Sequence, residues 1–250
     1  RAGRGWIRLH RPAMKILFFD LDGTLMPPGG ITDECLAELS RVRALGHKVV
    51  LNTGRSLAFL PPEVRALPLF DGRICGSAYI EYGGEILNNT VLSRATLEKA
   101  VRFAMETGTH TIIFEGVDEC FSTRPGVFLP ARECLLRDRL PEITKLTFWG
   151  DPTLVPDALF PELHILHLPH YAEGIQRGFD KSTGMALILK KEGLTPADAF
   201  AFGDSGNDLA MLRFAGHPVV MKEAPAEFDA FACYRAKSAD GVTDALRKFF

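Results

Sequence analysis

Short apolar runs that end in polar turns alternate with helical segments in the first and last parts of the chain. Residues 16–19 and 199–202 are apolar runs that lead into acidic turns, and residues 47–52 contain a third run. Such runs, without polar alternation, are typical of strands buried on both faces, as in parallel sheets. Between two of them, residues 31–46 carry apolar side chains at helical spacing, with Thr32 as the expected N-cap. The order strand, helix, strand predicts a β-α-β unit.

The middle of the chain, from about residue 82 to residue 178, has a different pattern. Helix-like and strand-like segments alternate there, with predicted helices over 92–107, 130–137 and 154–160 and predicted strands over 110–114, 143–148 and 162–168. This set suffices for a separate α+β module. We therefore expect a tail or expression remnant over 1–13, a core domain over 14–81 and 179–250, and an inserted domain over 82–178.

Two carboxylates directly follow the first apolar run. Asp20 and Asp22 stand one residue apart where this strand ends, at the edge of an open α/β sheet where ligands usually bind. Burying two carboxylates without a partner is costly, and a bound cation removes that cost. Because both side chains offer only oxygen atoms, Mg²⁺ is the expected ion. A solvated turn is the alternative interpretation of these two residues taken alone.

Three later segments place further polar groups beside apolar runs. The second strand is followed by Thr-Gly-Arg at 53–55, where the threonine could also simply cap the next helix. Lys181 precedes an apolar helix and, taken alone, could be a solvated charge. The segment 203–208, Gly-Asp-Ser-Gly-Asn-Asp, could by itself be a loop that caps a helix. Its Asp204 and Asp208 are four residues apart at a helix start, and therefore share one face.

Together these segments resemble the motifs of a known family. Asp-x-Asp-Gly-Thr-Leu at 20–25, Thr-Gly-Arg at 53–55, Lys181 and the segment 203–208 follow the order of the four motifs of the haloacid dehalogenase (HAD) phosphatase superfamily. Thr-Gly-Arg is the form common in its Cof-type, or IIB, branch. The resemblance implies an α/β fold in which a Rossmann-like parallel sheet core, with helices on both faces, carries an inserted α+β cap domain of the C2B type. The resemblance rests on specific motifs in the core and is weak in the insertion.

The resemblance also implies a role for each motif residue. Asp20 would be the nucleophile that forms an aspartyl-phosphate, and Asp22 the general acid/base. The residues implied in binding the phosphoryl group are Thr53, Gly54, Lys181 and Asn207. The implied metal residues are Asp20 and Asp204 as ligands, Asp208 in the metal shell, and Asp22 through its backbone carbonyl. A fixed cation such as Lys181 is needed because an aspartate nucleophile must approach an anionic phosphate.

Two segments depart from the family pattern, and the insertion carries no readable motif. Gly-Ser-Ala at 76–78 stands where the branch usually has Asn-Gly-Ala, and Lys-Glu-Ala at 222–224 where it has Gly-Asn-Ala. His164, His167 and His170 are three apart, but in a strand such positions point to opposite faces, which argues against a shared zinc site. Six polar residues of the insertion are candidates for facing the substrate: Glu115, Asp118, Arg124, Arg132, His167 and His170.

Composition and charge narrow the functional classes. The chain has 250 residues, 46% hydrophobic and 24% charged, with a formal net charge of −2, which gives no argument for nucleic acid or an anionic membrane as partner. No apolar run approaches the roughly 18 residues that a membrane span needs. Five scattered cysteines without a CxxC pair favour reduced thiols in a cytoplasmic protein.

The predicted function is that of a Mg²⁺-dependent phosphomonoester hydrolase acting on a small phosphorylated metabolite, sugar phosphates being the commonest class in the family. Three alternatives stay open: a phosphomutase with the same core and cap type, a protein that binds a phosphometabolite without turnover, and a DxD glycosyltransferase. The last is the weakest, because it accounts neither for Lys181 nor for the segment 203–208. No oligomeric state is predicted.

Overall fold

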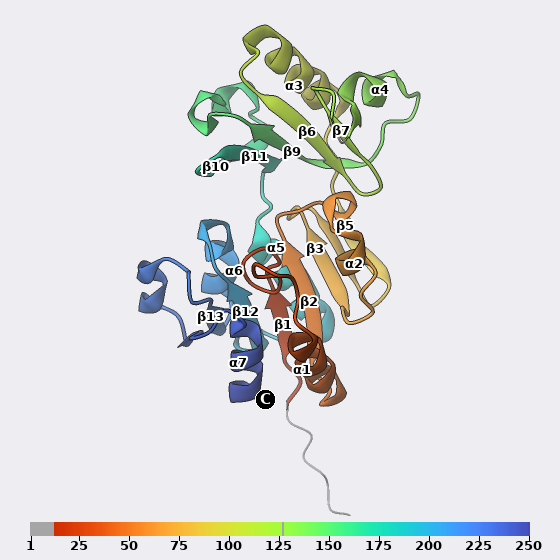
Figure 1. Ribbon diagram of the computed structural model, residues 1–250. Coiled ribbons are helices and arrows are strands. Elements are labelled where there is room, and N and C mark those ends of the chain that lie inside the picture. The colour runs from red at the N-terminus through yellow and green to blue at the C-terminus, as the bar shows by residue number, and fades with distance from the viewer. Residues whose placement is uncertain (1–12, 127) are drawn as a thin grey trace, which may run out of the picture.

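Two β-sheets organise the chain. The computed structural model describes residues 13–126 and 128–250, so all of the predicted tail except Ala13 lies outside the described residues. The first sheet has eight strands in the order β14-β13-β12-β1-β2-β3-β4-β5, and the second has six in the order β10-β11-β9-β6-β7-β8. Figure 1 shows the second sheet and its helices as a separate layer above the first.

The first sheet has the parallel core that the apolar runs predict. β1 (Ile16–Phe19) pairs in parallel with β2 (Lys48–Thr53) on one side and with β12 (Ala199–Gly203) on the other. The other strands are β3 (Gly72–Cys75), β4 (Tyr79–Tyr82), β5 (Glu85–Asn89), β13 (His217–Val220) and β14 (Tyr234–Arg235). Only the β3–β4 and β4–β5 pairs of this sheet, among the described strands, are antiparallel. The predicted α/β class with a parallel core is confirmed.

Helices cover both faces of the first sheet. Leu17 and Phe19 of β1 pack with two of them, α1 and α7, whereas Ile16 and Phe18 point the other way and pack with α5 and α6. Thr32 caps the first helix, as predicted. The helices of this layer are α1 (Asp33–Ala44), α2 (Pro62–Arg65), α5 (Lys181–Glu192), α6 (Leu209–Phe214) and α7 (Gly241–Phe249). Short 3₁₀ turns lie at η1 (Leu57–Phe59), η4 (Pro196–Asp198), η5 (Gly206–Asp208) and η6 (Ala226–Ala230).

The second sheet and its helices form what we call the inserted unit. Its pairs are antiparallel except for the short β7–β8 pair. Its strands are β6 (Thr111–Gly116), β7 (Cys120–Ser122), β8 (Leu129–Pro130), β9 (Ile143–Trp149), β10 (Leu163–His167) and β11 (Tyr171–Gln176). Its helical elements are α3 (Arg94–Thr107), α4 (Ala131–Leu136), η2 (Pro152–Leu154) and η3 (Asp157–Leu159). None of the helices in the described part of the chain combines the length and apolar character that crossing a membrane requires.

The two faces of the inserted sheet have different surroundings. Side chains such as Phe148 pack with α3 and α4 in one apolar cluster. On the other face Glu115 lies opposite Lys145, and Thr147 lies opposite Glu173. These four polar side chains are also buried, because their face is turned toward the strand ends of the first sheet. The polar face of the inserted sheet therefore lines the space between the two layers.

Three expectations about local structure need correction. Residues 154–160 contain 3₁₀ turns and not a helix, because Pro156 lacks a backbone N–H and keeps Val155 before it in an extended conformation. β11 is a strand that the pattern did not predict. β5 belongs to the first sheet, although the predicted boundary at residue 82 placed it in the insertion, because the turn at Gly83 and Gly84 (φ 60° and 80°) folds it back onto β4. The domain division itself stays a prediction.

Candidate active site

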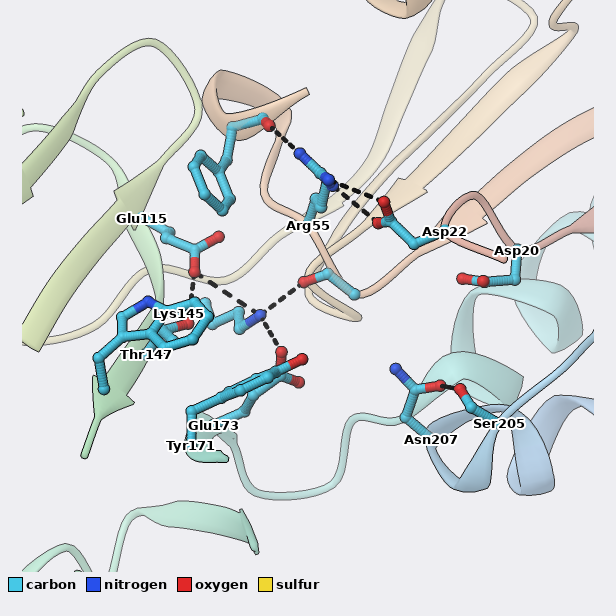
Figure 2. Close-up of a pocket in the computed structure, with 13 residues that line it drawn as sticks. Asp20, Asp22, Arg55, Glu115, Lys145, Thr147, Tyr171, Glu173, Ser205 and Asn207 are labelled. Atoms are coloured by element: carbon cyan, nitrogen blue, oxygen red, sulfur yellow. Dashed lines mark hydrogen bonds and ion pairs between the residues drawn. The ribbon is translucent and has the colours of Figure 1, made fainter. Parts of the chain in front are cut away.

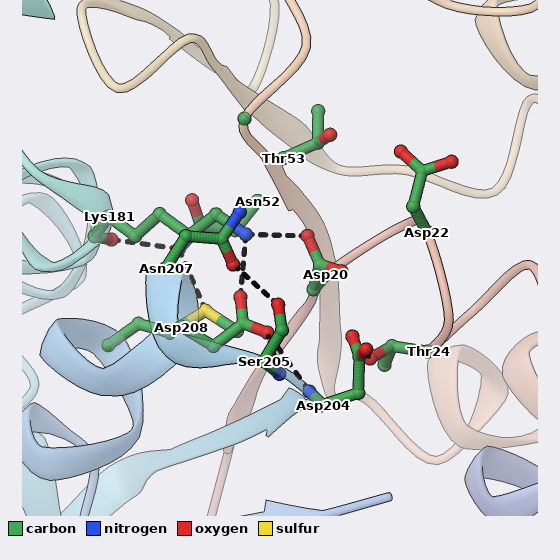
Figure 3. A network of polar contacts seen from close by, with 12 residues as sticks. Asp20, Asp22, Thr24, Asn52, Thr53, Lys181, Asp204, Ser205, Asn207 and Asp208 are labelled. Carbon is green, nitrogen blue, oxygen red and sulfur yellow. Dashed lines mark hydrogen bonds and ion pairs between the residues drawn. The ribbon is translucent and has the colours of Figure 1, made fainter. Parts of the chain in front are cut away.

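Polar residues from four segments meet at the carboxyl ends of the central strands. Asp20 follows β1, Thr53 ends β2, and Asp204 follows β12 on the other side of β1. Lys181, at the first turn of α5, reaches the same edge although it is 161 positions from Asp20 in the sequence. Parallel strands end at one edge of a sheet, so these distant segments converge there (Figure 3).

Lys181 bridges two buried carboxylates. Its Nζ donates hydrogen bonds to Oδ1 of Asp20 at 2.5 Å and to Oδ1 of Asp208 at 2.6 Å. All three side chains are almost fully buried. Burial disfavours the charged ammonium, but the charges of Asp20 and Asp208 outweigh it and raise the pKa of Lys181 above its usual value. The lysine is therefore a fixed positive charge beside Asp20.

Three carboxylates form a group that fits a cation. Asp20, Asp204 and Asp208 each offer an oxygen within 4.8 Å of the others, and no other such group of three or more metal-binding side chains occurs in residues 13–126 and 128–250. Burial and the nearby charge of Asp208 raise the pKa of Asp20, despite Lys181, and raise the pKa of Asp204 to about 6. Only hard oxygen ligands are present, and their repulsion favours a bound cation.

Hydrogen bonds fix the orientation of Asp208 and Asp204. Oδ2 of Asp208 accepts from the backbone N–H groups of Asp204 at 2.9 Å and Ser205 at 3.1 Å, while its Oδ1 faces Lys181. A Cβ on Gly23, whose φ is +82°, would lie 2.6 Å from Oδ2 of Asp204, so glycine is required there for the two turns to approach. Asp208 thus orients its neighbours, which leaves Asp20 and Asp204 with the more accessible oxygens.

Asp22 lies outside this group. Both of its carboxylate oxygens accept hydrogen bonds from Arg55, from Nε and Nη2, each at 2.7 Å. Arg55 also donates to the carbonyl oxygen of Phe59 at 3.3 Å and lies over its ring. The Asp22 side chain is about half exposed and borders the same cavity as Asp20. The metal role that the sequence assigns to its backbone carbonyl stays a prediction.

The residues predicted to bind phosphate surround one small space. A Cβ on Gly54 would lie 3.6 Å from Nδ2 of Asn207, so the missing side chain leaves this space open. Asn207 accepts from the Ser205 hydroxyl through Oδ1 at 2.8 Å, and its Nδ2 has no acceptor among the described residues. Thr53 accepts from the backbone N–H of Arg55 at 3.1 Å, which shapes the loop. One amide donor, Nδ2 of Asn207, is therefore available in the space that Asp20 also borders.

The inserted unit closes this space into a cavity of about 320 Å³. Figure 2 shows side chains of both layers converging on it. Lys145 donates from Nζ to Oε1 of Glu173 at 2.5 Å and to the carbonyl oxygen of Gly54 at 2.7 Å, and it lies 3.7 Å from Glu115. The backbone N–H of Ser56 donates to Glu115 at 3.2 Å. The inserted unit therefore binds the loop after β2 at two buried points.

Sequence reasoning found one of the cavity residues of the inserted unit and missed five. Of the six candidates, Glu115 lines the cavity and the other five do not. His167 instead contacts Pro152 and Asp157, and none of the three histidines belongs to a metal-binding group in the described part. The missed residues are Lys145, Thr147, Trp149, Tyr171 and Glu173. The polar–apolar alternation of 145–148 was a usable signal, because it puts Lys145 and Thr147 on one face.

The two departures from the family pattern have different surroundings. Ser77 is buried with φ 63°, the only non-glycine residue of the described chain in the left-handed region. The family's usual glycine would adopt this conformation freely, whereas an L-residue there costs roughly 1–2 kcal/mol. Lys222 and Glu223 are exposed, 3.7 Å apart, and do not line the cavity.

Comparison with known proteins gives matches over most of the chain. The family model described as haloacid dehalogenase-like hydrolase matches residues 17–145 and 164–246. A phosphoglycolate phosphatase of Nitrosopumilus maritimus is 27% identical over 242 residues, which cover 92% of this chain and 93% of that protein. An HMP-PP phosphatase of Serratia proteamaculans is 27% identical over 84% of each chain. Among solved structures, the HAD subclass IIB sugar phosphatase BT4131 is similar with a TM-score of 0.79 and 25% identity, covering 94% of this chain and 98% of that one.

Proposed function

The chain belongs to the haloacid dehalogenase-like hydrolases, as its motifs predicted, and from that premise we propose that it is a Mg²⁺-dependent phosphomonoester hydrolase. Its substrate would be a small phosphorylated metabolite, and the similarity to a solved sugar phosphatase supports a sugar phosphate as the first candidate. One observation carries the proposal. A buried lysine lies between Asp20 and Asp208, and Asp20 both belongs to a carboxylate group with Asp204 and lines the cavity. This is the arrangement that phosphoryl transfer to a carboxylate needs.

In the proposed reaction Asp20 is the nucleophile. One of its oxygens attacks phosphorus in line with the ester oxygen, so that a new O–P bond forms as the ester O–P bond breaks. The leaving oxygen takes a proton from Asp22, and the alcohol departs. Asp22 then accepts a proton from a water molecule, which attacks the aspartyl-phosphate and releases phosphate. Lys181 and Nδ2 of Asn207 hold the phosphoryl oxygens.

The acidic group would hold the metal ion. Asp20 and Asp204 would be side-chain ligands, Asp208 would orient them, and the Asp22 carbonyl is the predicted backbone ligand. When bound, Mg²⁺ supplies charge that offsets the carboxylates and polarises a phosphoryl oxygen.

Arg55 supports the acid/base in this scheme. Each oxygen of Asp22 accepts one hydrogen bond from its guanidinium and keeps a further lone pair, so Arg55 can hold Asp22 in place while Asp22 carries a proton to the leaving group. Arg55 would thus keep the acid/base oriented.

The test is phosphate release from a panel of phosphomonoesters, with Mg²⁺ and with EDTA. Asp20→Asn should lower turnover by about 10³-fold or more, because the amide is a poor nucleophile. Asp138→Asn, an exposed aspartate of the inserted unit, is the matched control and should turn over like the parent. Retained turnover in Asp20→Asn would refute the nucleophile assignment.

The same assay separates the alternatives. A phosphomutase would return the phosphoryl group to the sugar and release little phosphate. A binding protein would take up phosphosugars without turnover. A glycosyltransferase would need a nucleotide donor, so release of phosphate without one excludes it.

A further inference from the structure

We propose that Glu173 is a specificity-determining residue whose Oε2 accepts a hydrogen bond from a hydroxyl or ammonium group of the leaving group. The surrounding cavity would in turn disfavour leaving groups that carry a second anion. This inference rests on the proposed function and narrows the substrate class of the same site.

Glu173 has one satisfied and one unsatisfied oxygen. The residue is only 6% exposed. Its Oε1 accepts from Lys145 at 2.5 Å, whereas its Oε2 accepts no hydrogen bond from any described residue. A desolvated carboxylate oxygen without a donor is unfavourable, so a ligand that supplies a donor gains from meeting it.

The neighbouring glutamate differs in this respect. Oε1 of Glu115 accepts from the Thr147 hydroxyl, and Oε2 accepts from the backbone N–H of Ser56 at 3.2 Å. Both of its oxygens therefore have partners within the protein. Glu115 thus positions the ammonium of Lys145, while Glu173 keeps an oxygen for a ligand.

Glu173 lies close to the residues that would hold the ester. Both of its oxygens are 3.8 Å from the position of a Cβ on Gly54, and Nδ2 of Asn207 is 3.6 Å from that same position. Gly54 and Asn207 are the predicted phosphate-binding residues on this side. The donor that meets Glu173 therefore belongs to the part of the leaving group nearest the ester bond.

The charges on this side of the cavity disfavour a second anion. Both cations that line it are already engaged, Lys145 by Glu173 and the Gly54 carbonyl and Arg55 by Asp22. On the inserted unit, two glutamates face one lysine. A carboxylate or second phosphate on the leaving group would approach this buried negative charge, and neither of these two cations is free to pair with it.

The test uses a series of two-carbon esters that differ in one group: ethyl phosphate, 2-hydroxyethyl phosphate, 2-aminoethyl phosphate and phosphoglycolate. A hydrogen bond to a charged acceptor predicts a kcat/KM about tenfold or more above ethyl phosphate for the hydroxyl or the amino ester. Phosphoglycolate should be the poorest member. Comparison of 2-hydroxyethyl phosphate with 2-aminoethyl phosphate shows whether Glu173 prefers a hydroxyl or an ammonium donor.

Variants test whether Glu173 causes the preference for esters that carry a hydroxyl or amino group. Glu173→Gln keeps the shape and removes the charge, so the preference over ethyl phosphate should fall and phosphoglycolate should gain relative to it. Glu106→Gln, an exposed glutamate of α3, is the matched control and should keep the parent ranking. Wild-type enzyme that ranks ethyl phosphate or phosphoglycolate first, or that turns over neither donor-bearing ester, overturns the inference without any variant.

A reporter ester separates this inference from the function on which it rests. 4-Nitrophenyl phosphate has no donor near the ester. If it is hydrolysed, and Asp20→Asn is inactive, the proposed function stands whatever the series shows. If it and the series both give no phosphate, the proposed function and the inference fall together.

Discussion

The molecule contains two buried lysines that each lie between two carboxylates, and they differ in how they are built. Lys181 contacts Asp20 and Asp208 at 2.5 and 2.6 Å, and Lys145 contacts Glu173 at 2.5 Å and lies 3.7 Å from Glu115. Each lysine side chain is 3% exposed. Burial and charge therefore do not distinguish the two clusters.

Their places in the fold do distinguish them. The Lys181 cluster gathers at the ends of parallel strands and leaves carboxylate oxygens that face one another. The Lys145 cluster spreads across the face of an antiparallel sheet, where its lysine also binds the backbone of the loop after β2. The first arrangement suits chemistry on a phosphate, and the second suits holding and choosing what is attached to that phosphate.

The same substitution in both clusters is the sharpest test of this comparison. Lys181→Met should lower kcat by about 10³-fold or more, because the phosphoryl group loses its fixed cation. Lys145→Met should lower kcat/KM by about tenfold, mainly through KM. Each should lower the free energy of unfolding by about 3–5 kcal/mol, because buried carboxylates lose their partner. Steady-state kinetics and urea unfolding measure both effects, and equal losses of kcat would break the comparison.

Asp22→Asn tests the acid/base, with a smaller expected effect. The amide keeps the shape but cannot carry the proton, so kcat should fall by about 10²-fold. Steady-state kinetics measure this loss, and a kcat like that of the parent would remove this role.

Stabilisation by a metal ion should depend on the Lys181 cluster and not on the Lys145 cluster. Mg²⁺ at about 100 times its Kd should stabilise the protein by roughly 2.7 kcal/mol, seen as a rise in Tm over EDTA. Asp204→Asn should lose most of this rise, because a ligand is removed, whereas Glu173→Gln should keep it. A rise that survives in Asp204→Asn would place the ion elsewhere.

The smallest effect concerns a buried polar group outside both clusters. His47 is almost fully buried and accepts from the backbone N–H of Lys15 at 3.0 Å. Burial, and then the charge of Lys15, lower its pKa in the folded state. The unfolded state therefore binds the proton more readily, so this contribution to stability is present above about pH 6.5 and is lost as the pH falls below it. Urea unfolding at pH 7.5 and 5.5 should show less acid destabilisation in His47→Asn than in the parent.

The sequence predicted the first cluster in part because strand ends are readable, and in part through the resemblance of Lys181 and the segment 203–208 to family motifs. Apolar runs mark where β1 and β12 stop, and the residues that follow must share an edge once the strands are parallel neighbours. The structure brings Asp20, Lys181, Asp204 and Asp208 together at this edge, while their chemical roles stay predictions. Asp22 shows the limit of such reasoning, because no pattern indicated that Arg55 would hold it.

The contacts within the second cluster could not be predicted, because they depend on register, although Glu115 itself was a candidate. Glu115 meets Lys145 only through the pairing of β6 with β9, and a slip of one residue would put the two side chains on opposite faces of the sheet. The place of Glu173 in this cluster was harder still to predict from the sequence. Its strand follows Pro169 and contains Ala172 and Gly174, residue types that are uncommon in strands, so the segment resembled a loop.

The alternation along β6, β9 and β11 has a consequence for how such an enzyme can change over generations. One set of alternate residues packs with α3 and α4 and sustains the fold, while the other set faces the cavity and contacts what enters it. A lineage can therefore exchange residues of the cavity-facing set for a new metabolite while both the packing set and the strand-end residues stay as they are. The residues that pack the fold and the residues that contact the substrate therefore occupy neighbouring positions of the same strands.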